Sequence, residues 1–147
     1  MALTLVTIAL VRAKNKDLLL TSNIADADIQ AKIDDAIITV FNRVGEVYDT
    51  TLIDDTNCPT DIQMCIKLIA ASNAITDNYV DMPNAIKIAE MYKNEAFGNI
   101  KGIIDGKRRF ALLTKETAPL SIGFESVEDE IDTQAQTFID RANLYYR

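Results

Sequence analysis

The alternation of apolar and polar positions is clearest between residues 26 and 48, in the stretch DADIQAKIDDAIITVFNRVGEVY. Apolar residues recur there at steps of three and four, the spacing that places side chains on one face of an α-helix. Asp26 and Asp28 suit the first turn, where carboxylates meet unpaired amides and the positive end of the helix dipole. We therefore predict an amphipathic helix over Asp26–Tyr48, with a buried face made of Ile29, Ile33, Ile37, Val40, Phe41, Val44, Val47 and Tyr48.

Two later stretches have the same helical spacing. Asn57 is suited to cap a helix and Pro59 to its first turn, while Pro83 restarts the chain in the same way after a break. The pattern predicts helices over Pro59–Asn78 and Pro83–Asp105. Their predicted buried residues are Ile62, Cys65, Ile66, Ile69 and Ala70 in the first, and Ala85, Ile88, Ala89, Tyr92, Ala96, Ile100 and Ile103 in the second.

The two ends of the chain have less regular patterns. The opening MALTLVTIALV reaches Arg12 after too short an apolar run to span a bilayer and lacks an early basic region, so we expect a short core helix or strand and no membrane contact. FALLT and LSIGF are candidate strands of a small β-hairpin. Further on, Ser126 can cap a helix with Asp129 three residues later.

These elements predict a mainly α fold, a compact bundle of three to four helices with a small β-hairpin and a C-terminal arm. At 147 residues the chain has room for one core. We place the helical core at 1–116 and a hairpin strand with the arm at 117–147. The segment FIDRANLYYR concentrates residue types that are enriched in interface cores, and it either folds back as a fourth core helix or docks on a partner.

Glycines mark the third predicted helix. Gly98 and Gly102 lie four residues apart and each costs about 1 kcal/mol relative to alanine inside a helix, so we expect the backbone to need close approach there. The contact is either with another helix of the same domain or with another subunit. Gly106 suits the residue just past the helix end, where a left-handed conformation is cheapest for glycine.

Composition argues against an enzyme. Histidine is absent, which removes the commonest general base and the commonest metal ligand. Two cysteines, Cys58 and Cys65, are too few and wrongly spaced for a zinc site, and their number fits a reducing cytoplasm. Phosphate loops and nucleophile elbows are missing. We expect no metal site from these residues; a hydrolase using carboxylates such as Asp34 and Glu46 is the weakest alternative, because both lie on a solvated helix face.

The charge balance disfavours a protein whose main task is to neutralise phosphates, since the net charge is −7. Lys107, Arg108 and Arg109 nevertheless stand together. Cations just past a helix C-terminus face the negative end of its dipole, which gives the cluster a structural reason to exist. Helix termination with ion pairing to a neighbouring subunit is the interpretation we adopt, and contact with DNA is the alternative.

The order of these elements resembles the head-to-tail connector, or adaptor, proteins of tailed bacteriophages, in particular the phage Mu-type connector family. The resemblance spans most of the chain and rests on four features: the helix IQAKIDDAIITVFNRVGEVYD, the proline-led second helix, the helix AIKIAEMYKNEAFGNIKGIIDGK followed by FALL, and the tail FIDRANLYYR. Members of that family often have a glycine-rich stretch before the tail, where this chain has the acidic ESVEDEIDTQAQTFIDRA.

The resemblance implies a structural virion protein, without enzyme activity or cofactor, that forms a ring, commonly of twelve copies, beneath the portal and lines the genome channel. It implies partners in the portal protein, further copies of the chain, a tail-side stopper or tail protein and, transiently, genomic DNA. The protein would be made in the bacterial cytoplasm and located at the neck of the virion. By the same resemblance, the portal or an adjacent subunit would contact Phe138, Arg141, Leu144, Tyr145 and Tyr146, while Gly98, Gly102 and Lys107 to Arg109 would touch a subunit or face the channel.

A second class of protein fits the same composition. An acidic helical module that sequesters a basic protein partner would have the same charge and helical pattern. Self-association separates the two hypotheses, because only the adaptor must form a ring.

Overall fold

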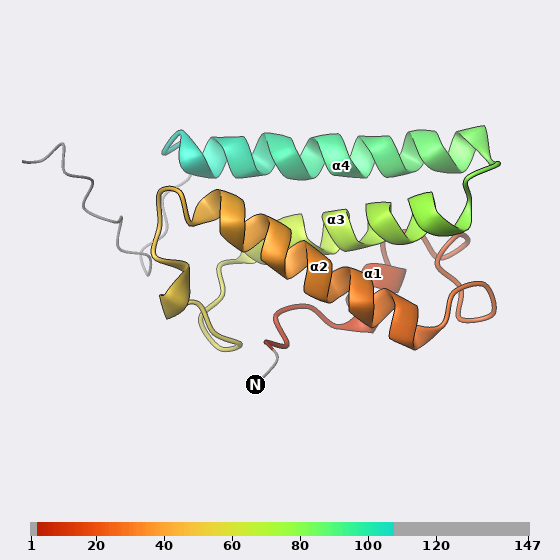
Figure 1. Cartoon of the computed structure of the whole chain (residues 1–147), viewed down its shortest axis with the longest axis horizontal. Coiled ribbons are helices and arrows are strands. Elements are labelled where there is room, and N and C mark those ends of the chain that lie inside the picture. Colours follow the sequence, from red (N-terminus) through yellow and green to blue (C-terminus); the bar gives the residue numbers. More distant parts are fainter. Residues whose placement is uncertain (1–2, 108–147) are drawn as a thin grey trace, which may run out of the picture. The chain divides into compact units, whose positions relative to one another are not determined.

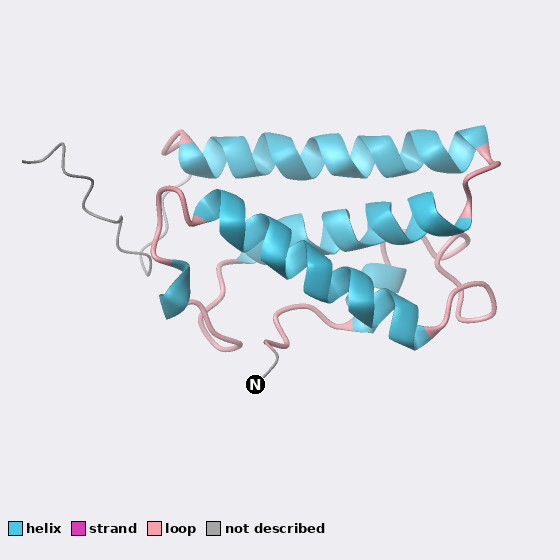
Figure 2. Cartoon of the chain, in the orientation of Figure 1, coloured by secondary structure: helices cyan, strands magenta, loops and turns pink. Residues whose placement is uncertain are grey.

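The computed structural model describes residues 3–107, which are helical for most of their length (Figures 1 and 2). This part of the chain confirms the predicted mainly α class and has no strand. The predicted hairpin, the arm and the boundary at residue 116 lie outside the described residues. The elements in order are α1 (Ile8–Arg12), α2 (Asp26–Val44), the short 3-10 turn η1 (Thr50–Leu52), α3 (Thr60–Asn78) and α4 (Pro83–Ile104).

Helix α3 is the central element of the described bundle. It packs against α4, α2 and α1, and α4 runs back alongside it after the short turn that joins them (Figure 1). A helix that is covered from several sides must be apolar around much of its circumference. This is why α3 buries more than the five residues predicted for it; the additional ones are Leu68, Ala71, Ser72, Ala74 and Ile75.

Small side chains line the contact between α3 and α4. Ala85, Ala89 and Ala96 of α4 are all buried, and short side chains allow two helix axes to approach closely. The hydroxyl of Ser72 donates to the carbonyl oxygen of Ala89 at 2.8 Å. The Sγ of Cys65 lies 3.7 Å from the carbonyl oxygen of Ala96. The close approach of these helices therefore relies on alanines.

Arg12, the last residue of α1, connects the N-terminal region to α2. Its guanidinium donates to the carbonyl oxygens of Leu19 at 2.6 Å and Ile24 at 2.8 Å. The same group donates to Asp26, in the first turn of α2, at 2.6 Å. One side chain thus holds α1, the following loop and the start of α2 together.

The predicted end of the first long helix is wrong by four residues. Helix α2 ends at Val44, and Gly45 is its C-cap. Beyond it the chain turns back, with the amides of Val47 and Tyr48 both donating to the Val44 carbonyl. Tyr48 is still buried, so the predicted core membership is right although the residue is not helical.

The predicted capping role of Asn57 is also wrong. Its Oδ1 accepts from the amide of Asp54 at 2.7 Å, and its side-chain amide donates to the Leu52 carbonyl at 2.8 Å. The N-cap of α3 is Pro59, which has no side-chain capping bond. An asparagine side chain can cap a helix or bond to the backbone of a neighbouring turn, and Asn57 bonds within the turn that precedes α3.

Candidate functional site

The side of α4 opposite its buried alanines is the strongest candidate for a functional surface. Five of the exposed residues of this helix recur at steps of three and four, so they share one face. Figure 1 shows α3 beside α4 on only one side. We call this surface the outer face of α4 and define it by Lys87, Met91, Asn94, Gly98 and Lys101.

Gly98 lies in the C-terminal half of the outer face. A Cβ added there would meet no atom of the described residues within 4 Å. The expectation that Gly98 brings two helices of the same domain together is therefore wrong for residues 3–107. Its cost of about 1 kcal/mol relative to alanine has no compensating contact in this part of the chain.

Met91 is a member of this face that the sequence pattern did not single out. Its side chain is 66% exposed. The signal was present, because Met91 is out of phase with Ala85, Ala89 and Ala96 and therefore falls on the solvent side of the predicted helix. A large apolar side chain so exposed on a long helix indicates a surface available for contact.

The end of α4 follows the prediction for Gly106. This glycine has φ of 69°, the left-handed region, and its amide donates to the carbonyl of Ile103 at 3.1 Å. The amide of Lys107 donates to the carbonyl of Gly102 at 3.0 Å, so the last turn closes as a Schellman motif. The Lys107 side chain is exposed next to this negative end of the helix dipole.

The remaining predicted site residues lie outside the described part of the chain. They are Arg108, Arg109, Phe138, Arg141, Leu144, Tyr145 and Tyr146.

Burial and hydrogen bonding shift the pKa values of Cys58 and Lys32. Half-burial raises the pKa of the Cys58 thiol to about 11, so the thiol is protonated near neutral pH and is a poor nucleophile. A hydrogen bond from Lys32 to Asp77 raises the pKa of Lys32, and the two side chains form an ion pair between α2 and α3. Residues 3–107 contain no group of three or more acidic or cysteine side chains arranged to hold a metal ion.

A helix that crosses a bilayer needs about 20 consecutive, mainly apolar residues. None of the helices between residues 3 and 107 is both long and apolar enough to do so.

Comparison with known proteins assigns no family to this chain. No family model, no curated protein and no solved structure matches this chain.

Proposed function

We propose that the chain is an adaptor subunit that assembles into a ring between the portal and the tail of a tailed bacteriophage. The order of helices, glycines and tail motif that resembles the phage connector family supports this role, and a mainly helical bundle is compatible with it. The observation that carries the proposal is Gly98. A glycine on the exposed side of a long helix, with no atom of residues 3–107 near the place of its missing side chain, is explained by the close approach of a neighbouring subunit.

The outer face of α4 has the chemistry of such a contact. Met91 supplies exposed apolar surface, Lys87 lies one turn before it and Lys101 about one turn after Gly98. Glu90 and Glu95 are exposed beside Met91. In a chain of net charge −7, lysines on one face can pair with acidic residues elsewhere on the next copy. A contact between two different patches repeats head to tail and closes into a ring when the rotation between copies allows it.

The first test is the native mass of the full chain, alone and mixed with a candidate portal protein. The proposal expects a closed oligomer, at twelve times the 16.3-kDa subunit mass for the copy number common in the family, either alone or on the portal. A chain that stays monomeric under both conditions would refute the adaptor role. A one-to-one complex with a basic protein and no self-association would favour the alternative, an acidic module that sequesters its partner.

The second test locates the contact. Gly98→Leu places a side chain in space that is empty among residues 3–107, so the described bundle should fold normally while ring formation is lost. Asn42→Leu is the matched control, since Asn42 is exposed on α2. Equal assembly of both variants would show that the outer face of α4 is not the subunit contact, even if the ring itself exists.

A further inference from the structure

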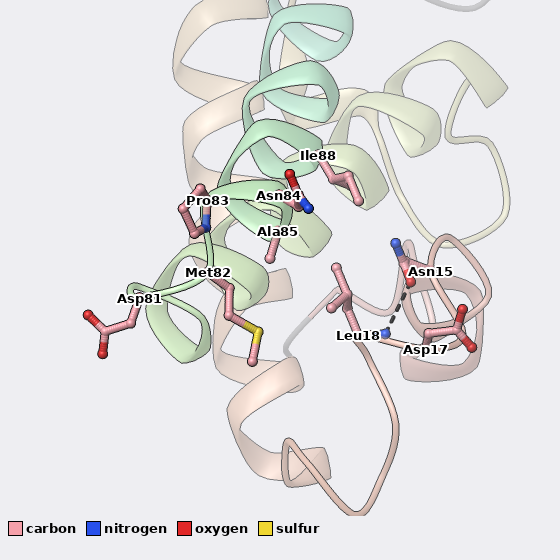
Figure 3. A pocket seen from close by; sticks show the side chains of 9 residues that line it. All are labelled: Asn15, Asp17, Leu18, Asp81, Met82, Pro83, Asn84, Ala85 and Ile88. Atoms are coloured by element: carbon pink, nitrogen blue, oxygen red, sulfur yellow. Dashed lines mark hydrogen bonds between the residues drawn. The ribbon is translucent and has the colours of Figure 1, made fainter.

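A second surface lies at the turn between α3 and α4, away from the middle of the outer face. There a groove with a volume of about 470 Å³ opens between the loop after α1 and the start of α4 (Figure 3). Its two walls come from segments more than sixty residues apart in the sequence. We call it the turn groove.

The floor of the turn groove is apolar. Leu18 forms one side, and Met82, Ala85 and Ile88 form the other; in Figure 3, Leu18 lies across the groove from the start of α4. Met82 is 54% exposed although it is a large apolar side chain, and the adjacent Val80 is 70% exposed. Two such residues next to a groove are an apolar surface that a partner could cover.

Carboxylates stand at the rim of the turn groove. Asp17 belongs to the loop wall and Asp81 to the α3–α4 turn, and both are exposed. Neither has a hydrogen bond or ion pair within residues 3–107, and none of the residues that line the groove is lysine or arginine. The groove therefore offers two unpaired negative charges beside an apolar floor.

The loop wall is held in place by two tyrosine hydroxyls, one from the C-cap of α3 and one from α4. Tyr79, at the end of α3, donates to the carbonyl of Leu18 at 2.6 Å. Tyr92 of α4 donates to the carbonyl of Lys14 at 2.9 Å. Within the loop, Oδ1 of Asn15 accepts from the amide of Leu18 at 3.1 Å, the dashed line in Figure 3. A wall anchored in this way loses little freedom when a ligand binds, which favours affinity.

We propose that the turn groove binds a peptide segment of another protein in which a lysine or arginine stands close to a large apolar side chain. The apolar side chain would cover Leu18, Met82 and Ile88, and the cation would pair with Asp17 or Asp81. Charge complementarity favours this occupant, because a cation can pair with Asp17 or Asp81 whereas an acidic segment would be repelled by both. The site goes beyond the ring, since each subunit has its own groove whether or not it assembles.

The test uses the full chain and an array of octapeptides. Each peptide has one arginine and one leucine, at every spacing from adjacent to four residues apart, in a background of glycine and serine. The inference expects at least one spacing to bind, as measured by fluorescence anisotropy. The same peptide with arginine replaced by glutamate, or with leucine replaced by serine, should bind more weakly. If no peptide binds better than the background sequence, the inference is refuted.

Matched variants locate the binding. Asp17→Asn and Asp81→Asn should each weaken the best peptide by about twofold to fivefold, as expected for an exposed ion pair, and Asp35→Asn on α2 should not. Met82→Gln should weaken it by about threefold or more through lost apolar contact, whereas Met91→Gln on the outer face of α4 should not. Equal effects of the groove and control variants would overturn the inference.

Self-association is the competing occupant of the turn groove. If Met82→Gln abolished oligomer formation instead of peptide binding, the groove would be a contact between copies and the peptide inference would be wrong. Peptide binding by a chain that proves monomeric would support the groove while refuting the ring, so the two proposals fail separately.

Discussion

Replacement of Arg12 by methionine would test how the N-terminal region is held to the core. Methionine keeps much of the apolar stem and removes the guanidinium. The two carbonyl oxygens that the guanidinium satisfies belong to Leu19 and Ile24, residues that are only 1% and 2% exposed. Asp26, the third acceptor, has a side chain that is 63% exposed.

These exposures predict which of the three hydrogen bonds contribute most to the free energy of unfolding. A buried carbonyl that loses its donor costs about 1–3 kcal/mol, whereas an exposed ion pair contributes about 0–1 kcal/mol. Arg12→Met should therefore lower the free energy of unfolding by about 2–6 kcal/mol, because two carbonyls lose their donor. Asp26→Asn should lower it by less than about 1 kcal/mol, since the guanidinium and both carbonyl bonds remain.

The assay is urea unfolding followed by far-UV circular dichroism, because the chain has no tryptophan and the described core is helical. Linear extrapolation gives the free energy for the wild type, both single variants and the double variant. The reasoning predicts a coupling energy between Arg12 and Asp26 of less than about 1 kcal/mol. Equal destabilisation by Arg12→Met and Asp26→Asn would show that the ion pair, not the pair of carbonyls, holds α1 in place.

Three further predictions concern single sites. Gly106→Ala should destabilise the protein by about 1–2 kcal/mol in the same unfolding assay, because φ is 69° at this residue; an unchanged free energy would mean that the helix end rearranges without cost. Cys58 should react slowly with a thiol reagent at pH 8 in the native protein and rapidly in urea, because half-burial raises its pKa to about 11; fast native reaction would contradict this. Hydrogen bonds from Thr56, chiefly from its hydroxyl and then from its amide, lower the pKa of Asp54 below 3.8. The stability that the carboxylate adds is therefore complete above pH 3.8 and is lost as the pH falls through the pKa of Asp54 in the folded protein. An NMR titration in which Thr56→Val leaves the pKa of Asp54 unchanged would refute this cause.

The sequence alone determined the three long helices and much of their buried faces. Each depends on interactions within a few residues: the spacing of apolar positions, acidic residues in the first turn of α2, proline at the start of α4 and glycine at its end. The predicted end of α2 and the predicted cap of α3 were wrong because several local turns compete there at similar free energy. The structure shows which turns form after Val44 and before Pro59.

Only the tertiary structure decided which helix is central, which small residues form the close contact and where the turn groove lies. Arg12 finds its acceptors in the loop and in α2, and the groove joins the loop around Leu18 to the start of α4. The pattern left open whether the glycines of α4 contact another helix of the same domain or another subunit; alanines make the contact with α3, while Gly98 faces open space within the described residues. Periodicity reports which side of a helix is apolar, but it cannot say which partner covers that side, because the partner is chosen by packing between segments distant in sequence.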